Sequence, residues 1–297
     1  MGVYLEKVKE PLDIPDAFKS IVGDFEAYRF YDDFEGEPKE YSVYKLVSDR
    51  GAFVLKKSED EEYHNAEVKH YGLLAGLPVP DFFGAADGYV LTGFVEGEDL
   101  KNATDEGVKA AAESLVLIMN AYPMGRDYET ERYNTYLKRL EKRADRLEKE
   151  PELKKAFRIF QKRQESIPLT LSNSDLLPIN VIFDGRKATV IDWEFGGFMP
   201  YTLDIVRFFA HAHGSQPFKM TDAQKRFFVD AVYSGLDVKP EREVYDRDIM
   251  LGLFNEYIEI LEWYFGDENV ERGDTFREYY ALAKEYSERI NALPTEA

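Results

Sequence analysis

Apolar and polar residues alternate in the first third of the chain in a way that predicts β-strands. Residues 41–47 and 52–56 alternate or run apolar, and the polar residues 48–51 between them form a turn signal. A helical pattern follows at 61–74, and residues 88–94 have the character of a further strand. The first part of the chain is therefore expected to be a sheet interrupted by one helix.

The pattern changes near residues 95–97. Beyond Gly97 the apolar residues recur mainly at helical spacing, apart from one pair of short strands. We therefore expect an α+β fold with a small β-rich lobe at 1–95 and a larger, mainly helical lobe at 96–297.

The pair of short strands in the helical part is a predicted hairpin. Residues 179–183 and 188–192 are apolar and β-branched, and a polar turn at 184–187 joins them. A turn centred near Arg186 would place Asn180 opposite Asp192, and cross-strand neighbours have Cβ atoms about 5 Å apart. An amide oxygen and a carboxylate together suit a hard cation such as Mg²⁺, whose other ligands are water and phosphate oxygens.

Asp175 precedes this hairpin by a short loop that contains Pro178. Its carboxylate can therefore reach the same place from the side. A carboxylate beside a metal ion and an incoming hydroxyl can orient that hydroxyl and accept its proton. Any one Asn or Asp more often ends a strand or caps a turn, but Asp175, Asn180 and Asp192 together have the spacing of one catalytic site.

Two segments carry a resemblance to a known family. Residues 173–180 resemble the His-x-Asp-x-x-x-x-Asn catalytic loop of the aminoglycoside phosphotransferase and choline kinase group, and residues 190–194 resemble its metal-binding segment. These proteins are small-molecule kinases with a two-lobed, protein-kinase-like fold. The resemblance implies that Asp175 is the catalytic aspartate, Asn180 a metal ligand and Asp192 the main Mg²⁺ ligand, with ATP as phosphoryl donor.

The chain departs from the family pattern at Asn173, where the family usually has His. In kinase-like folds that His is chiefly a scaffold that hydrogen-bonds backbone near the metal-binding segment, and an Asn amide can donate such a bond. Asp204 matches the family's aspartate that opens a helix and braces the catalytic loop. An acid stabilised by the helix dipole is an equally good interpretation of Asp204.

The resemblance extends to the expected nucleotide site. Lys56 matches the strand lysine that binds ATP phosphates, and Glu67 matches the helix residue that holds this lysine in place. Lys57 is the alternative lysine, and Glu61 and Glu62 compete with Glu67. By position, residues 92–95 would connect the lobes, with backbone groups from Thr92 to Phe94 and beyond holding adenine.

Composition narrows the function further. The chain has no cysteine, which excludes disulfides and thiol chemistry, and its net charge of −19 argues against nucleic-acid binding. No apolar run approaches the roughly 20 residues that span a bilayer, so we expect no membrane contact and a cytoplasmic protein. The negative charge favours a cationic small-molecule partner, although such acidity more often serves solubility.

Two further patterns in the helical part are interpreted as structural. His211 and His213 are two residues apart, which on a helix points them to different faces, so they are expected to be ordinary helix residues. The aromatic and acidic run at 254–265 has helical spacing and is mostly core. Within it, Glu256, Glu259 and Trp263 could line a pocket for an amine.

The sequence thus predicts an ATP- and Mg²⁺-dependent phosphotransferase that acts on a hydroxyl of a small molecule. Candidate acceptors are an aminoglycoside, choline or a related amino alcohol, and a sugar or nucleoside derivative. The alternatives are a catalytically degenerate, nucleotide-binding relative, which Asn173 favours, and a structural protein of the same fold. The acceptor, the choice of ATP over GTP and the oligomeric state stay open at this point.

Overall fold

The strands predicted near the beginning of the chain belong to one antiparallel sheet. The computed structural model describes residues 3–34, 37–58, 60–211, 219–266 and 270–294. The six strands of the sheet, in the order β1-β2-β3-β4-β6-β5, are all antiparallel to their neighbours. They are β1 (Val3–Lys7), β2 (Phe25–Phe34), β3 (Glu37–Ser48), β4 (Gly51–Lys57), β5 (Phe82–Ala86) and β6 (Tyr89–Gly93).

Two helices accompany the sheet, where the sequence pattern predicted one. The predicted helix is present as α2 (Glu61–Leu73), and the Asp60 side chain caps it by accepting from the N–H groups of Glu62 and Tyr63. The prediction missed α1 (Asp16–Val22), a seven-residue helix that follows Pro15. So short a helix offers too few turns for a periodic apolar pattern.

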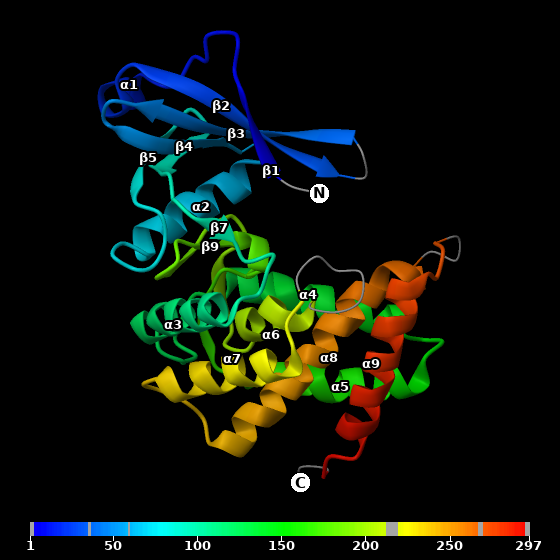
Figure 1. Cartoon of the computed structure of the whole chain (residues 1–297). Coiled ribbons are helices and arrows are strands. Elements are labelled where there is room, and N and C mark those ends of the chain that lie inside the picture. Colours follow the sequence, from blue (N-terminus) through cyan, green and yellow to red (C-terminus); the bar gives the residue numbers. More distant parts are fainter. Residues whose placement is uncertain (1–2, 35–36, 59, 212–218, 267–269, 295–297) are drawn as a thin grey trace.

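The rest of the chain is mainly helical, as predicted (Figure 1). Its helices are α3 (Asp105–Ala121), α4 (Glu131–Arg146), α5 (Pro151–Gln164), α6 (Leu203–Ala210), α7 (Asp222–Gly235), α8 (Arg242–Gly266) and α9 (Asp274–Asn291). Its short strands and one 3₁₀ turn are β7 (Glu98–Asp99), β8 (Leu169–Ser172), η1 (Pro178–Asn180), β9 (Val181–Phe183), β10 (Ala188–Val190) and β11 (Gly197–Pro200).

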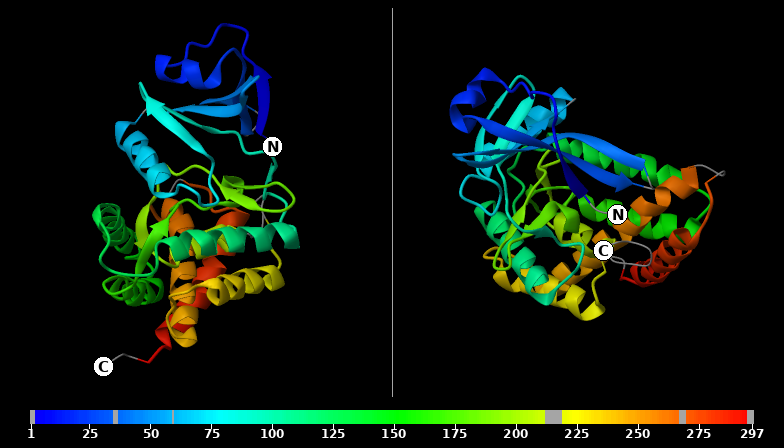
Figure 2. Two further views of the ribbon diagram at one scale, coloured as in Figure 1. Left: turned by 90° about the vertical axis from the view of Figure 1, so that its left-hand side faces the viewer. Right: turned by 45° about the horizontal axis from the view of Figure 1, so that its top comes forward.

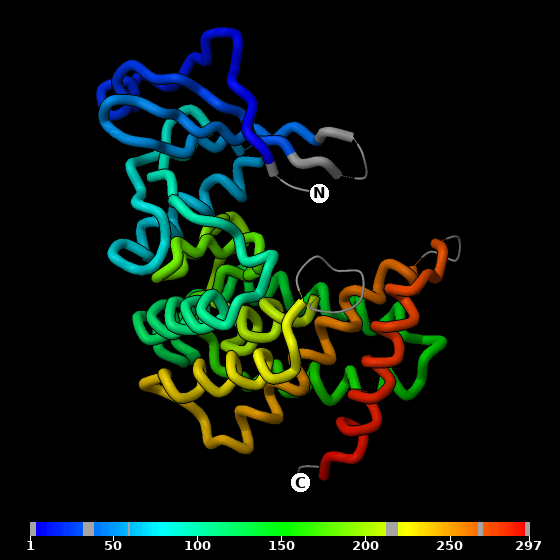
Figure 3. Tube along the Cα trace, viewed as in Figure 1, coloured from blue at the N-terminus to red at the C-terminus, as the bar shows by residue number. Residues whose placement is uncertain are grey.

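The sheet and the helical part lie one above the other, with α2 on the side of the sheet that faces the helices (Figures 1 and 2). The tube in Figure 3 shows that the described chain begins beside the sheet and ends at the far side of the helical part. The two small sheets, β10-β9-β7 and β11-β8, belong to the helical part. The predicted α+β arrangement is therefore confirmed.

Two hydrophobic cores support this arrangement. A small core lies between α1 and the sheet and includes Phe18, Leu46 and Leu55. The large core fills the helical part, and it also includes Tyr71, Leu74 and Val90 from α2 and the sheet side. Burial of apolar surface thus joins the two parts of the molecule as well as stabilising each.

None of the helices in the described part of the chain combines the length and the apolar character needed to cross a bilayer.

Candidate active site

Strand alternation separates Lys56 from Lys57. On β4 the side chains of Phe53 and Leu55 are buried in the small core, so Lys56 projects from the opposite face of the sheet. Lys57 lies 5.4 Å from the centre of the Tyr89 ring instead. The structure therefore directs Lys56, and not Lys57, toward the helical part.

Lys56 meets three carboxylates. Its Nζ lies 2.6 Å from Asp192 Oδ1, 2.8 Å from Glu194 Oε2 and 3.3 Å from Glu67 Oε2. Of the three glutamates proposed on α2, only Glu67 reaches the lysine and is buried, at 2% exposed, while Glu61 and Glu62 are exposed at the start of the helix.

The protonation of this cluster follows from its burial and charge. Burial alone would lower the pKa of Lys56, but Asp192, Glu67 and Glu194 together raise it, so the lysine stays charged. Burial raises the pKa of Glu67 to about 7; Lys56 opposes this rise, whereas Asp192 and Glu194 add to it. Glu67 is also the most distant of the three partners.

The loop after β8 carries Asp175 and is braced by Asp204. The buried carboxylate of Asp204 accepts hydrogen bonds from Ser172 Oγ (2.7 Å), the Asn173 N–H (2.7 Å) and the Ser174 N–H (3.0 Å). Burial raises the pKa of Asp204 to about 6, and these donors oppose that rise. The bracing role expected of Asp204 is thus present, in the first turn of α6.

Asn173 makes the scaffold contact expected of it. Its Nδ2 donates to the carbonyl oxygens of Asp192 (2.8 Å) and Ile191 (3.2 Å), which ties the loop to the predicted metal-binding segment. Ser174 and Asp192 flank this contact with φ values of 65° and 60°. A left-handed backbone at a residue other than glycine costs on the order of 1–3 kcal/mol, and such strain clusters at functional sites.

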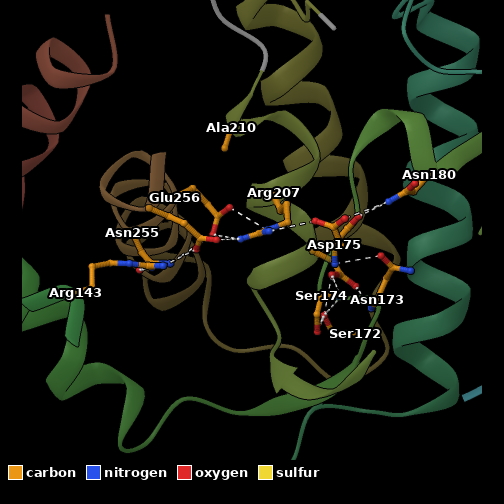
Figure 4. A network of polar contacts seen from close by, with 12 residues as sticks. Arg143, Ser172, Asn173, Ser174, Asp175, Asn180, Arg207, Ala210, Asn255 and Glu256 are labelled. Atoms are coloured by element: carbon orange, nitrogen blue, oxygen red, sulfur yellow. Dashed lines mark hydrogen bonds and ion pairs between the residues drawn. The ribbon is translucent and has the colours of Figure 1, made fainter. Parts of the chain in front are cut away.

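Asp175 is held from two sides. Arg207 Nη1 donates to its Oδ1 at 3.3 Å, and Asn180 Nδ2 donates to its backbone oxygen at 2.8 Å and approaches its Oδ2 at 3.5 Å (Figure 4). Burial raises the pKa of the Asp175 carboxyl, while the charge of Arg207 works against that rise. The geometry leaves Oδ2 as the more weakly bonded carboxylate oxygen.

The predicted pairing of Asn180 with Asp192 is wrong by one residue. The strands pair as Val190 with Val181, which places Asn180 level with Ile191 instead, whose N–H donates to the Asn180 carbonyl at 2.9 Å. The loop is a two-residue turn, so its centre falls between Gly185 and Arg186 and not on Arg186. Asn180 itself ends the η1 turn, where Pro178 fixes the backbone.

The donor set nevertheless suits a divalent cation. Lys56 supplies one positive charge against the three carboxylates around it, which leaves an excess of negative charge. The Asn180 amide nitrogen is used on Asp175, so its oxygen is the atom that can act as a ligand beside Asp192. Among the described residues no three His, Cys, Asp or Glu side chains form a ready-made metal site.

The segment after β6 agrees only in part with the predicted adenine contacts. Thr92 is buried in a strand that has neighbours on both sides. The Phe94 N–H donates to the Ala52 carbonyl at 3.0 Å, so this N–H is used by the sheet. The Phe94 ring instead has Lys45 Nζ 3.5 Å from its centre.

Contacts of α2 and α4 hold the segment around Asp192 in place. The buried His70 ring lies with Nδ1 3.2 Å from the Trp193 carbonyl, and Arg132 donates to the Glu194 carbonyl at 3.0 Å. Because a carbonyl can only accept, His70 carries its proton on Nδ1. A Cβ on Gly196 would come within 2.8 Å of that nitrogen, so this close approach requires glycine.

A chain of alternating charges extends from Asp175 into α8 (Figure 4). Arg207 also binds Glu256 Oε2 at 3.0 Å and Glu259 Oε1 at 2.8 Å. Arg143 binds Glu259 at 3.0 Å, Glu262 at 2.9 Å and Asn255 at 2.7 Å.

The proposed amine pocket is therefore wrong for the two glutamates, because arginines already face them. Glu256 is buried, whereas Trp263, the pocket's third proposed member, is 76% exposed. Phe254, Tyr257, Ile258 and Leu261 are buried, which confirms that the apolar part of the run is core. His211 follows the last residue of α6, and His213 lies outside the described residues.

Sequence reasoning missed two residues of the site, Glu194 and Arg207. Glu194 follows Asp192 by two positions, within the segment 190–194 that the sequence had already singled out. Arg207 is the one basic residue of α6, whose other residues apart from Asp204 are apolar. A lone cation in such a helix is a signal for a buried ion pair.

Comparisons with known proteins identify the family of the chain. A profile of the phosphotransferase enzyme family matches residues 39–233, well over half of the chain. No curated protein sequence matches the chain.

Several solved structures share the fold. The amicoumacin kinase hAmiN, in complex with AMP-PNP, Ca²⁺ and Ami, is 14% identical (TM-score 0.59), with 83% of this chain and 85% of that one covered. Choline kinase LicA from Streptococcus pneumoniae is 14% identical (TM-score 0.56; 84% and 90% covered). The ADP-bound aminoglycoside phosphotransferase APH(2'')-Ib is 15% identical (TM-score 0.55; 92% and 97% covered). At these identities the likeness shows a kinase-like fold.

Proposed function

Because the chain belongs to the phosphotransferase enzyme family, we propose that it transfers the γ-phosphoryl group of ATP to a hydroxyl group of a small molecule. The observation that carries this proposal is the link made by Asn173. Its amide ties the loop that bears Asp175 to the segment that bears Asp192, opposite the lysine that β4 presents. Base, metal ligand and phosphate-binding cation thus converge from three separate segments.

Each residue has a proposed role that follows from its contacts. Lys56 binds phosphate oxygens, and Glu67 keeps its flexible stem in place. Asp192 and the Asn180 oxygen hold Mg²⁺, which when bound neutralises phosphate charge. Glu194, close to the same lysine, completes the set of carboxylates that face the nucleotide.

Asp175 is the proposed general base. It orients the acceptor hydroxyl and takes its proton as the acceptor oxygen bonds to the γ-phosphorus. The bond between that phosphorus and the β,γ-bridging oxygen breaks, and its electron pair leaves with ADP. The raised pKa of Asp175 suits a group that has to accept a proton.

Adenine binding is proposed for the segment from Thr92 to Val95. Thr92 and Phe94 shape the pocket wall, since the N–H of Phe94 is donated to Ala52. The next backbone N–H, that of Val95, is the proposed donor to the base.

The acceptor is proposed as a small molecule with a hydroxyl group, and the net negative charge argues against nucleic acid. The net charge of −19 would favour a cationic acceptor. However, Glu256 and Glu259 are already balanced by Arg207 and Arg143, so they give no support to a cationic group. Aminoglycosides, amino alcohols and sugars all stay in the test set.

Asn173 was the residue that favoured a catalytically degenerate protein. Its amide makes the contact to the Asp192 carbonyl that the scaffold needs, which supports the active alternative. The convergence of Lys56 and three carboxylates at one point supports a nucleotide site over a purely structural role.

A screen of a metabolite pool for ATP-dependent phosphorylation tests the function and identifies the acceptor. Asp175→Asn should lower turnover by about 10²–10⁴-fold, the usual contribution of a general base. Its affinity for MgATP should stay within a few-fold, because Asp175 acts on the acceptor. Asp192→Ala is the matched comparison and should instead abolish Mg²⁺-dependent nucleotide binding in calorimetry. Near-normal turnover of Asp175→Asn would refute the assignment.

A further inference from the structure

Arg207 connects Asp175 to an acid pair, the buried Glu256 and the partly exposed Glu259, and its own side chain is only 14% exposed. The guanidinium is closer to the acid pair, at 3.0 and 2.8 Å, than to Asp175, at 3.3 Å. Figure 4 shows it pointing between the two. Its charge is therefore satisfied mainly by α8, and only in part by Asp175.

This sharing has a chemical consequence. A guanidinium with Asp175 as its only partner would form a full ion pair and hold the carboxylate as a weak base. Here most of the guanidinium charge is paired with Glu256 and Glu259. Arg207 therefore fixes the orientation of Asp175 without neutralising the charge of the Asp175 carboxylate. The contact is made to Oδ1, which leaves Oδ2 on the side of Asn180.

We propose that Arg207 is a positioning residue that holds Asp175 by Oδ1, so that Oδ2 receives the acceptor proton, and that Glu256 and Glu259 anchor Arg207 for this task. The inference rests on the proposed function. It deepens that function in two ways. One oxygen of Asp175 is held by Arg207 and the other accepts the proton, and the glutamates of α8 support the phosphoryl transfer by anchoring Arg207.

Arg143 provides a matched control. It binds the same Glu259, together with Asn255 and Glu262, and its guanidinium is buried like that of Arg207. Its hydrogen bonds and ion pairs lie on the far side of the acid pair from Asp175. A general loss of packing or charge balance in this region should therefore affect both arginine variants alike, whereas positioning of Asp175 should depend on Arg207 alone.

The test compares Arg207→Lys with Arg143→Lys. A lysine keeps the charge but cannot reach the acid pair and Asp175 with separate donors. We expect Arg207→Lys to lower kcat about 100-fold, the effect of a misplaced catalytic group, with KM for the acceptor and the Kd for MgATP within about threefold of wild type. Arg143→Lys should keep kcat within about threefold. The probes are choline, kanamycin, glucose and, for basal hydrolysis, water.

Chemical rescue distinguishes positioning from folding. Added guanidinium should restore part of the kcat of Arg207→Ala and leave Arg143→Ala unchanged, with melting temperatures measured in parallel. If Arg207→Ala does not fold, the Arg207→Lys comparison decides alone. Equal kcat losses in the two lysine variants, or a kcat of Arg207→Lys equal to wild type, would overturn the inference while leaving the proposed function intact. A wild-type protein that transfers phosphate to none of the probes or pool metabolites would overturn both.

Discussion

At the scale of single residues, the site depends on one amide. Asn173 donates to the carbonyls of Ile191 and Asp192 in the proposed metal-binding segment and, through its own N–H, to Asp204. Asn173 stands where the family pattern has histidine. Its role is to donate hydrogen bonds to backbone carbonyls, and another suitably placed donor can do the same.

Asn173→His should change kcat by no more than about tenfold. A neutral hydrogen bond contributes roughly 0.5–1.5 kcal/mol net, which is at most about a tenfold rate effect. Asn173→Ala, which removes both donors, serves as the control and should be slower than wild type with the same acceptor. A gain in kcat far beyond tenfold on introducing histidine would mean that the chain had lost catalysis at this position.

The candidate residues of the site could be picked out from the sequence, but the partners that the structure gives them could not. The spacing of Asp175, Asn180 and Asp192 indicated a phosphoryl-transfer site, and strand alternation alone would have chosen Lys56 over Lys57. Arg207 and Glu256 were hidden because their pairing joins α6 to α8, 49 positions apart in sequence. Ion pairs across such separations depend on tertiary packing, which no local pattern reports.

At the scale of elements, α2 is the part that connects sheet and catalytic segment. It carries Glu67 toward Lys56 and His70 toward the Trp193 carbonyl. Patterning predicted its existence and nearly its bounds. The hairpin register was one residue off, because strand pattern alone does not fix the turn centre and η1 took Asn180 out of the strand.

The stability of this connection should depend on pH through His70. Burial lowers the pKa of His70 from 6.5 to about 4. Between these values the unfolded chain binds more protons than the folded one, so stability falls as the pH falls from about 6.5 to 4. The full effect is on the order of 3 kcal/mol.

His70→Gln, which does not titrate, isolates this term. The wild type should be the more stable protein at pH 7.5, and its advantage in free energy of unfolding should shrink steadily toward pH 4. Chemical denaturation at a series of pH values in the absence of metal measures the difference. Parallel stability curves for the two proteins would show that His70 is not buried in its neutral form.

At the scale of the whole molecule, the large core does not stop at the lobe boundary expected from composition. Tyr71, Leu74 and Val90 belong to it, although they come from α2 and the sheet. A composition shift marks where one kind of secondary structure gives way to another. It does not report which side chains pack across the change.

Thermal unfolding should therefore be a single cooperative transition. Leu74→Ala, in the large core, and Leu46→Ala, in the small core, should each lower the free energy of unfolding by roughly 2–5 kcal/mol. Both variants should lower the melting temperature of the same single transition. Differential scanning calorimetry checks this through equal calorimetric and van't Hoff enthalpies. Two transitions, each moved by only one of the variants, would show two independently stable lobes.

Lys56 contacts three carboxylates, so a nucleotide that binds at the proposed site has to replace some of these contacts with its own phosphate oxygens. The lysine reaches from β4 of the sheet to Asp192 and Glu194 in the other part of the molecule, so it fastens the two parts together. A triphosphate that binds this lysine must break its ion pairs with Asp192 and Glu194, and these two carboxylates then lose their positive partner. Nucleotide and divalent ion are then coupled ligands, each raising the affinity for the other. If the proposed function holds, we expect the complete MgATP complex to bind better than either component alone.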